Sequence, residues 1–192
     1  MKKFTLKTER LLLRPLKLSD VDTILPNAND KAQTRFLKRV EPPMSRRVEE
    51  QWVCDSWKKW KNGSSLVFAA VRTDSKEMVG CLELLDVSKT HRNAKIGIFF
   101  FKKHWGKGFG TEAVERLIRF GFEELKLNRI EYGFLAHNKR SEGIFKRLGF
   151  KREGLQREFL FKRGKFQDHV LGSLLSSEWE RREKEKDKKK TR

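Results

Sequence analysis

Residues 96–113 restrict what this chain can fold into more than any other stretch. They begin with an apolar run of strand length at 96–101 and end in residues that start a helix running towards Lys126. Between the two lies W-G-K-G-F-G at 105–110, with glycines at alternate positions. Glycines let the backbone turn sharply and be approached closely, and a helix start presents unpaired N–H groups at the positive end of its dipole. The stretch therefore predicts a strand, a turn and a helix that bind an anion, most naturally a phosphate.

The glycine spacing excludes two familiar phosphate-binding loops. Dinucleotide-binding proteins need G-x-G-x-x-G, and the P-loop needs G-x-x-x-x-G-K-[ST], whereas this chain has G-x-G-x-G at 106–110. Taken alone, the turn is also compatible with a plain strand-to-helix connection that binds nothing.

The hydrophobic periodicity of the rest of the chain predicts a mixed α/β domain. A strand, several helices and further strands alternate along the sequence, and a hairpin closes it. Strands are expected at 4–14, 66–71, 78–87, 96–101 and 130–136, the hairpin at 159–171, and the longer helices at 45–62, 111–126 and 138–148.

One carboxylate, Glu83, stands in an apolar row of the strand expected at 78–87. Alternate residues of a strand share a face, so Glu83 lies with Cys81 and Leu85. A carboxylate there must find a partner, reach solvent in a cleft or hold its proton more tightly. The two hypotheses are an ion pair with an arginine and a general base.

The charge balance bears on partners and on the place of the protein in the cell. The formal net charge is +19 over 192 residues, which indicates proximity to RNA or the ribosome, or alternatively a solvated basic surface. Two cysteines are too few for a disulfide framework or a zinc site, and we expect no metal. The absence of a long apolar run and of a signal-peptide pattern favours a cytoplasmic protein without a membrane partner.

The length fits one domain, which we expect to cover residues 1–177. The remaining residues, 178–192, form a highly charged tail, expected to be a helical extension or disordered.

Two separated blocks of the sequence carry a family resemblance. In the first, Trp105 precedes Gly108 and Gly110, where the motif [QR]-x-x-G-x-[GA] has Gln or Arg first. In the second, residues 138–150 read N-x-x-S-x-x-I-F-x-x-L-G-F, close to N-x-x-[SA]-x-x-[LI]-Y-x-x-[LA]-G-F. Both are motifs of the GCN5-related N-acetyltransferase (GNAT) family, which the chain resembles. Its opening, T-E-R-L at 8–11, is similar to the Rim-type subgroup, which acetylates the N-termini of ribosomal proteins.

This resemblance implies a GNAT fold. That fold is a mixed α/β architecture with a twisted, mostly antiparallel sheet of six to seven strands flanked by helices. The sheet is splayed between strands 4 and 5, which are the strands expected at 96–101 and 130–136. Acetyl-CoA, the co-substrate, would lie in the split, and a bulge in the fourth strand would open the ladder there.

The resemblance also implies which residues bind acetyl-CoA. Amides of the glycine turn would bind the pyrophosphate, and the strand before the turn would pair with the pantetheine arm as an added strand would. The helix at 138–148 would contact the arm from the other side. The full set is Ile98, Phe99, Phe100, Trp105, Gly106, Lys107, Gly108, Phe109, Gly110, Thr111, Asn138, Ser141, Phe145 and Lys146.

The implied reaction is direct transfer of the acetyl group to a primary amine, most naturally a protein N-terminus. Such an amine has a pKa near roughly 8 and is partly neutral at neutral pH. Glu83 is the expected general base, with Glu131 as a second candidate. Ser141 is expected to donate a proton to the leaving thiolate, because the family's tyrosine is Phe145 here and has no proton to give.

Two other functions stay open on the sequence alone. One is acetylation of a small amine such as a polyamine or an antibiotic, against which the net positive charge counts. The other is a module that binds RNA or the ribosome and retains acetyl-CoA only as a ligand. The identity of the acceptor and a homodimeric state are not decided by the sequence.

Overall fold

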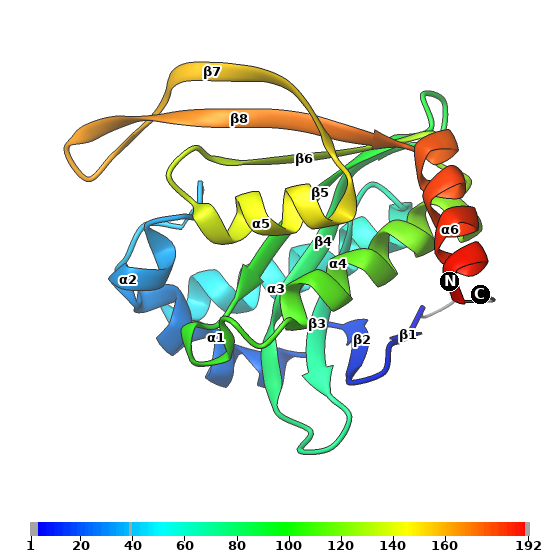
Figure 1. The fold of residues 1–192 in the computed structure, drawn as a ribbon. Coiled ribbons are helices and arrows are strands. Elements are labelled where there is room, and N and C mark those ends of the chain that lie inside the picture. Colours follow the sequence, from blue (N-terminus) through cyan, green and yellow to red (C-terminus); the bar gives the residue numbers. More distant parts are fainter. Residues whose placement is uncertain (1–3, 39, 191–192) are drawn as a thin grey trace.

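The computed structural model describes residues 4–38 and 40–190 (Figure 1). Three consecutive strands, β3 to β5, are followed by α4, β6 and α5, and then by the hairpin of β7 and β8, in the order that the periodicity predicts. The strands are β1 (Leu6–Lys7), β2 (Leu11–Pro15), β3 (Leu66–Arg72), β4 (Met78–Ser88), β5 (Asn93–Phe100), β6 (Arg129–Leu135), β7 (Lys151–Lys162) and β8 (Lys165–Leu175). The α-helices are α1 (Val21–Asn29), α2 (Lys31–Thr34), α3 (Arg46–Asn62), α4 (Phe109–Arg119), α5 (Lys139–Leu148) and α6 (Ser176–Lys190).

All eight strands form one sheet in the order β1-β2-β3-β4-β5-β6-β8-β7. Every pairing is antiparallel except β5 with β6, which is parallel. The sheet thus has the mostly antiparallel character expected, with a strand more than the six to seven predicted. The extra strand arises because residues 4–14 do not form one strand. Thr8 turns the chain by bonding Leu11 through both its backbone and its side chain, which separates β1 from β2.

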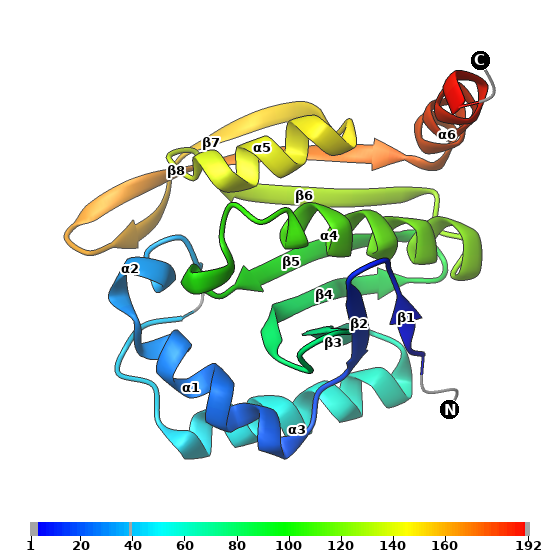
Figure 2. The ribbon, with the colours of Figure 1, turned by 60° about the horizontal axis from the view of Figure 1, so that its bottom comes forward.

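Helices cover both faces of the sheet, and Figure 2 shows α1 and α3 on the opposite side from α4 and α5. The face towards α1 and α3 buries Val67, Ala69 and Cys81 against those two helices. The face towards α4 and α5 buries a larger aromatic core that includes Tyr132 and Phe134. Residues that alternate along one strand therefore enter two different cores.

The strands β5 and β6 separate part of the way along their length. They pair only from Asn93 with Arg129 to Ile96 with Tyr132, whereas β5 continues to Phe100 beside β4. The divergence lies at the pair of strands where the splay was predicted. The predicted bulge in β5 is absent, because the β4–β5 register is continuous over 95–100; the strands part without one.

The charged segment at the end of the chain continues directly from β8 as α6. Trp179 is only 2% exposed and belongs to the core of the α4–α5 face. Lys186 pairs with Glu115 on α4 at 2.6 Å, so α6 contacts α4 through charged side chains. In the described part of the chain, no helix combines the length and apolar character needed to span a bilayer.

Candidate functional site

The glycine turn between β5 and α4 has open backbone amides. Gly106 and Gly108 have φ of 77° and 84°, in the left-handed region that favours glycine. Gly108 is also the N-cap of α4 and offers no side-chain cap. Within residues 4–38 and 40–190, the amides of Gly106, Lys107 and Gly108 donate to no protein acceptor. Since the first N–H groups of a helix also lack internal partners, this turn can bind an anion at the positive end of α4.

The turn is held from outside by the chain's opening T-E-R segment. Glu112, in the first turn of α4, accepts hydrogen bonds from Thr8 Oγ1 at 2.5 Å and from Arg10 Nε at 2.7 Å. The Arg10 guanidinium also donates to the Lys107 carbonyl at 3.1 Å and lies 4.8 Å from the centre of the Phe109 ring. The Phe109 side chain is buried, so this residue offers a ligand only its backbone. We call these contacts of Thr8 and Arg10 with Glu112 and with the Lys107 carbonyl the brace. The brace fixes the turn without using the backbone amides of the turn.

Trp105, at the position where the family has Gln or Arg, ties the turn to β5. Its indole N–H donates to the Phe100 carbonyl at 2.7 Å, and Arg140 of α5 stacks on its ring at 4.0 Å. The Phe36 ring contacts both Trp105 and His137, at 6.2 and 5.4 Å between ring centres. Trp105 follows β5 and His137 follows β6, so Phe36 bridges the ends of the two diverging strands.

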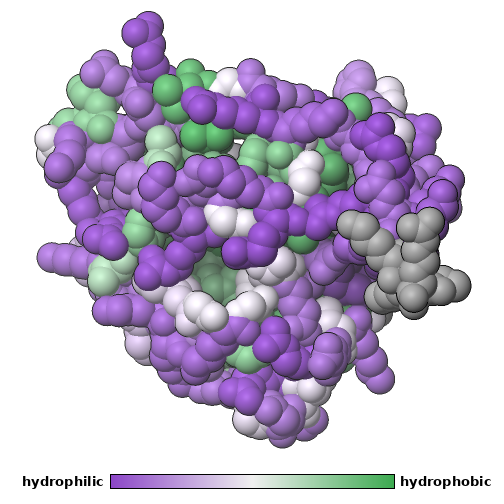
Figure 3. Space-filling model, in the orientation of Figure 1, coloured by the Kyte–Doolittle hydropathy of each residue, from purple (hydrophilic) through white to green (hydrophobic). Residues whose placement is uncertain are grey.

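The predicted pantetheine-binding residues lie on the part of β5 that has no partner strand on the β6 side. Ile98, Phe99 and Phe100 pair with β4, and beyond Ile96 no described strand pairs with them on the other edge. On that edge the Phe100 carbonyl accepts the Trp105 indole N–H, so the free part lies before it. The side chains of Ile98, Phe99 and Phe100 are half-buried, in contrast to the fully buried Ile96. Figure 3 shows a recess with apolar residues at its bottom below α5, on the side where this end of β5 lies in Figure 1. The open edge can accept an extended, partly apolar chain.

Glu83 lies next to this edge, on the face of the sheet that α1 and α3 cover, as does Cys81 two residues earlier. It pairs with Gly97 of β5, and a Cβ on Gly97 would lie 2.5 Å from Glu83 Oε1. Gly97 therefore makes room for the carboxylate, which a glycine inside a strand can signal. Glu83 is half-buried and makes interactions within the protein.

A second carboxylate, Glu49 on α3, belongs to the same region. It is 5% exposed, and burial raises its pKa. Burial also raises the pKa of the Cys81 thiol, helped by the charges of Asp20, Glu83 and Glu49. Glu49 was not among the predicted site residues. The available signal was its place four residues before Val53, on the apolar side of the helix.

Glu131, the other predicted base, lies at the closed end of the β5–β6 pair. It is opposite Lys95 and forms an ion pair with Arg129 at 3.3 Å. Arg129 in turn binds Glu153. Glu131 therefore belongs to an ion-pair network on the paired part of the strands, whereas Glu83 lies beside the open part.

The start of α5 brings two predicted residues together. Asn138 is the N-cap, and its Oδ1 accepts from the Ser141 amide at 3.3 Å. Its Nδ2 donates to Ser141 Oγ at 3.0 Å, and Ser141 is 7% exposed. Phe145 is packed in the core in a stacked pair with Phe150, whereas Lys146 is exposed and pairs with Glu142 at 2.7 Å.

The geometry fits the acetyl donor that the resemblance implies. Open amides suit a diphosphate, the exposed Lys107 adds positive charge beside them, and the unpaired edge of β5 leads away from the turn. Glu83 on one face and Ser141 on the other flank the place where the strands part. Among the described residues, no cluster of three or more His, Cys, Asp or Glu is suited to hold a metal ion.

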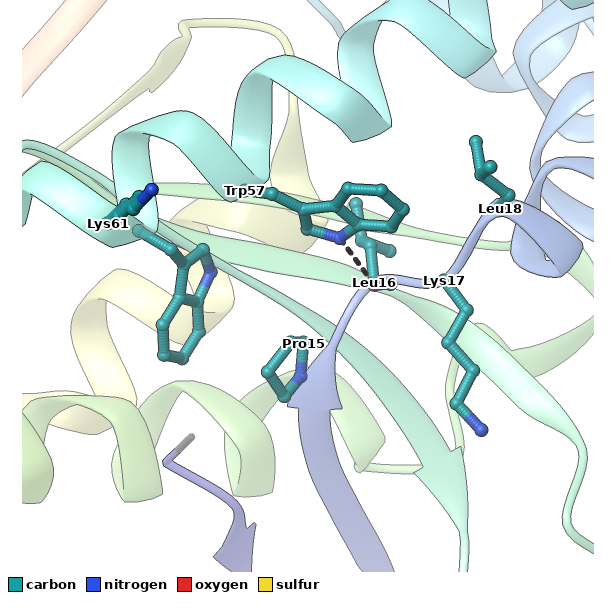
Figure 4. A pocket seen from close by; sticks show the side chains of 7 residues that line it. Pro15, Leu16, Lys17, Leu18, Trp57 and Lys61 are labelled. Atoms are coloured by element: carbon teal, nitrogen blue, oxygen red, sulfur yellow. Dashed lines mark hydrogen bonds between the residues drawn. The ribbon is translucent and has the colours of Figure 1, made fainter. Parts of the chain in front are cut away.

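A surface pocket of about 590 Å³ lies elsewhere, between α3 and the segment after β2 (Figure 4). Trp57 and Trp60 line it, and the Trp57 indole donates to the Leu16 carbonyl at 2.8 Å. Its lining residues include none of the predicted site residues. The two tryptophans therefore do not form part of the site between β5 and β6.

Comparison with known proteins agrees with this geometry. Residues 10–151 match the family model described as Acetyltransferase (GNAT) domain. The [Ribosomal protein uS5]-alanine N-acetyltransferase of Escherichia coli is 31% identical, over 92% of this chain and 93% of that protein. An uncharacterized N-acetyltransferase, p20, of Bacillus licheniformis is 32% identical, over 91% of this chain and 98% of that protein.

A solved structure gives the same answer for the fold. The spermidine N-acetyltransferase of Vibrio cholerae, in complex with CoA and spermine, superposes with a TM-score of 0.80 at 25% identity, covering 90% of this chain and 99% of that one. The uncapped glycine turn, the parted strands and the family match over 10–151 lead to one conclusion. The chain belongs to the GNAT family and is an acetyl-CoA-dependent N-acetyltransferase.

Proposed function

We propose that this protein acetylates the N-terminal α-amino group of a protein, with ribosomal proteins as the first candidates. The observation that carries this proposal is the set of basic side chains around the ends of β5 and β6. Arg140 lies 4.0 Å from the centre of the Trp105 ring, and Arg35 lies 4.5 Å from that of Phe36. The Lys38 ammonium lies 3.1 Å from His169 Nε2. Burial lowers the pKa of His137, and the charges of Arg35 and Lys165 lower it further. Burial and Lys38 likewise lower the pKa of His169 to about 4.

Positive charge where β5 and β6 part would favour some acceptor amines over others. Spermidine and similar polycations are repelled by it. A protein α-amino group, with a pKa near roughly 8, is partly neutral in solution and loses its remaining charge easily. Acidic or neutral residues after the N-terminal one would then be attracted or tolerated. The similarity to the E. coli ribosomal-protein enzyme supports the same substrate class.

In this proposal each group of residues has one task. The amides of Gly106, Lys107 and Gly108 hold the diphosphate of acetyl-CoA, which supplies an activated thioester. The free edge at 98–100 orients the pantetheine arm. Glu83 accepts the proton of the amine, directly or through water, and Ser141 stabilises charge on the departing sulfur. Most of the rate gain then comes from positioning and from electrostatic stabilisation.

Acetylation of spermidine is the second candidate. It is favoured by similarity to an enzyme of that name from Vibrio cholerae, 28% identical over 109 residues. The surroundings of His137 count against it, because Arg35 and Lys165 act there. A cluster of free carboxylates near the opening would be needed to bind a polycation.

The test is a competition between acceptors. Purified protein is incubated with acetyl-CoA and one of three acceptors: peptides with free N-termini, the same peptides with a blocked N-terminus and an internal lysine, or spermidine. Released CoA is measured, and mass spectrometry locates the acetyl group. We expect α-amino acetylation of the first set to be fastest. Faster turnover of spermidine would overturn the substrate class, and RNA binding without any turnover would favour the ligand-only alternative.

A further inference from the structure

A second surface pocket, of about 470 Å³, lies at the opposite end of β5 from the glycine turn. It forms where the end of α3, the start of β3, the turn between β4 and β5 and the segment before β6 come together. Small-molecule sites have volumes of about 300–1,000 Å³, so this pocket is large enough to hold a ligand. The described residues that line it include none of those assigned to acetyl-CoA or to the chemical step.

The buried part of this pocket is apolar. Trp60, Leu66 and Leu127 line it and are 4%, 4% and 2% exposed. The ring of Phe4, which also lines it, lies 6.3 Å from the Trp60 ring. The Trp60 indole N–H already donates to the Val67 carbonyl at 2.9 Å, so its one polar atom is satisfied. The bottom of the pocket can therefore take an apolar group out of water.

The exposed part of the same pocket is basic. Four of its lining residues are exposed cations, namely Lys61, Lys89, Arg92 and Lys126. No Asp or Glu occurs among the described residues that line it. Within residues 4–38 and 40–190, the side chains of the three lysines form no hydrogen bond or ion pair. Four like charges around one opening repel each other and attract an anion.

The acidic residues that lie nearest along the chain are bound to other partners. Asp86 on β4 pairs with Lys95 at 3.0 Å. Glu124, which precedes the last segment of the pocket, pairs with Arg116 at 3.2 Å. The positive charge at the opening is therefore not neutralised by these carboxylates.

Two of the four cations have an unusual backbone. Arg92 and Lys126 have φ of 51° and 56°, in the left-handed region where glycine and asparagine are less costly. Arg92 Nε donates to the Lys126 carbonyl at 2.9 Å, which holds the two turns together. The other guanidinium nitrogens have no acceptor among the described residues, so they can bind an anionic group. The backbone itself gives no reason for a long basic side chain at either position.

We propose that this pocket is a second ligand site, which binds a small organic anion. The apolar body of the ligand would pack against Trp60 and Leu127, and its carboxylate or phosphate would lie between Arg92, Lys89 and Lys126. The apolar bottom distinguishes this site from one for a bare inorganic anion, and the four cations exclude an amine. The proposal does not depend on which amine accepts the acetyl group.

The place of the pocket in the sheet keeps the two ligands apart. The first rung between β5 and β6 joins Asn93 to Arg129, directly after Arg92. The Arg92 carbonyl accepts the amides of Asn128 and Arg129 at 2.6 and 3.2 Å. A ligand in this pocket would thus contact the closed end of the β5–β6 pair, whereas acetyl-CoA would bind at the open end. Both sites can be occupied at the same time.

Calorimetric titration in the presence of excess CoA tests the proposal. The probes are 2-naphthoate, its uncharged analogue 2-naphthalenemethanol, and inorganic phosphate. We expect 2-naphthoate to bind once per chain with a dissociation constant of roughly 1 mM or lower, as its number of atoms implies. The alcohol and phosphate should each bind at least roughly tenfold more weakly. Equal binding of all three probes, no binding of 2-naphthoate, or binding that CoA abolishes would overturn the proposal.

Variants locate the binding. Lys89→Glu/Lys126→Glu should weaken 2-naphthoate binding at least roughly tenfold, since two attractive charges become repulsive, and Val87→Asn, in the pocket lining, should weaken it several-fold. Arg152→Glu/Arg157→Glu is the control: it changes the net charge equally on exposed residues of β7, which have no partner in the described chain, and should bind as the wild type does. The probe should raise the Tm of the wild type and of the control but not of the lysine variant. An equal loss of affinity in the control would overturn the site.

Discussion

The first turns of α4 and α5 both lie where β5 and β6 diverge, but their N-termini are capped differently. At α5, Asn138 caps the helix by bonding Ser141. At α4, the N-cap is Gly108, which has no side chain to cap with. The α4 end therefore keeps backbone amides available for an anion. At the α5 end, the Asn138 side chain already accepts a backbone amide, and the polar group on offer is the buried hydroxyl of Ser141.

In the proposed function, one of these helix ends serves binding and the other serves chemistry. An uncapped end costs stability, and here the brace from Thr8 and Arg10 to Glu112 holds it in place. A capped end is stable by itself and can carry a side chain in a fixed position. The following predictions test this contrast, from the largest expected effect to the smallest.

The largest effect is expected from giving the start of α4 a capping side chain, which would make it resemble the start of α5. In Gly108→Asp, a carboxylate would bond the open amides itself and repel a diphosphate. We expect acetyl-CoA affinity to fall roughly 1,000-fold, which is about 4 kcal/mol, for two lost charge-assisted hydrogen bonds. Isothermal titration calorimetry measures this directly.

A matched control for that variant is Gly63→Asp. Gly63 is also a left-handed glycine, with φ of 75°, but it ends α3 and has open space where a Cβ would be. We expect a similar strain cost and unchanged acetyl-CoA affinity. Equal affinities of Gly108→Asp and wild-type protein would disprove the anion site.

Removing the proposed base, Glu83, should leave both helix ends intact and so separate acetyl-CoA binding from the chemical step. We expect Glu83→Gln to lower kcat roughly 100-fold, the low end for a general base, with acetyl-CoA affinity unchanged. Glu131→Gln serves as the comparison, because that carboxylate lies in the ion pair with Arg129. Steady-state kinetics over pH would show the loss. A larger effect at Glu131 would exchange the two roles.

Weakening the brace should reveal how much α4 depends on it. Burial would raise the pKa of Glu112, but hydrogen bonds from Thr8 and Arg10 outweigh it and hold that pKa below its usual value. The stabilisation is therefore complete above the unfolded pKa, near roughly 4.3, and is lost as pH falls further.

We accordingly expect Glu112→Gln to lower the free energy of unfolding by about 1–2 kcal/mol at pH 7. As pH falls, the free energy of unfolding should decrease less in this variant than in the wild type. Urea denaturation at several pH values is the measurement. Glu50→Gln is the control, since the ion pair of Glu50 with Arg46 is exposed and such pairs contribute little. An identical acid profile for wild type and Glu112→Gln would contradict the brace.

The cap of α5 should have the smallest effect. Asn138→Ala removes one cap, which costs about 1 kcal/mol, and takes one donor from Ser141. We expect a lower Tm, a kcat reduced a few-fold and unchanged acetyl-CoA affinity. Ser45→Ala, at the cap of α3, should cost similar stability with no change in kcat. If the two variants have equal kcat, the cap at Asn138 is purely structural.

Several parts of the site could be predicted because they depend on local sequence. The alternating glycines and the helix after them predicted the turn, and Ser45 and Asn138 predicted two helix starts. Local signals were weaker at residues 4–14, where Thr8 bonds Leu11 and makes two strands of one. A turn of that kind depends on one side chain and leaves the apolar pattern unchanged.

What the sequence alone determined is therefore the order of the strands and helices after residue 14, the glycine turn before α4 and the family. Only the tertiary structure decided which residues meet. Phe36 bridges the ends of β5 and β6, Gly97 makes room for Glu83, and the rings of Tyr132 and Phe145 lie 6.3 Å apart. Periodicity fixes the face of its own strand or helix on which a residue lies. Contacts between distant segments depend on how the sheet opens and how the helices pack, which no local pattern records.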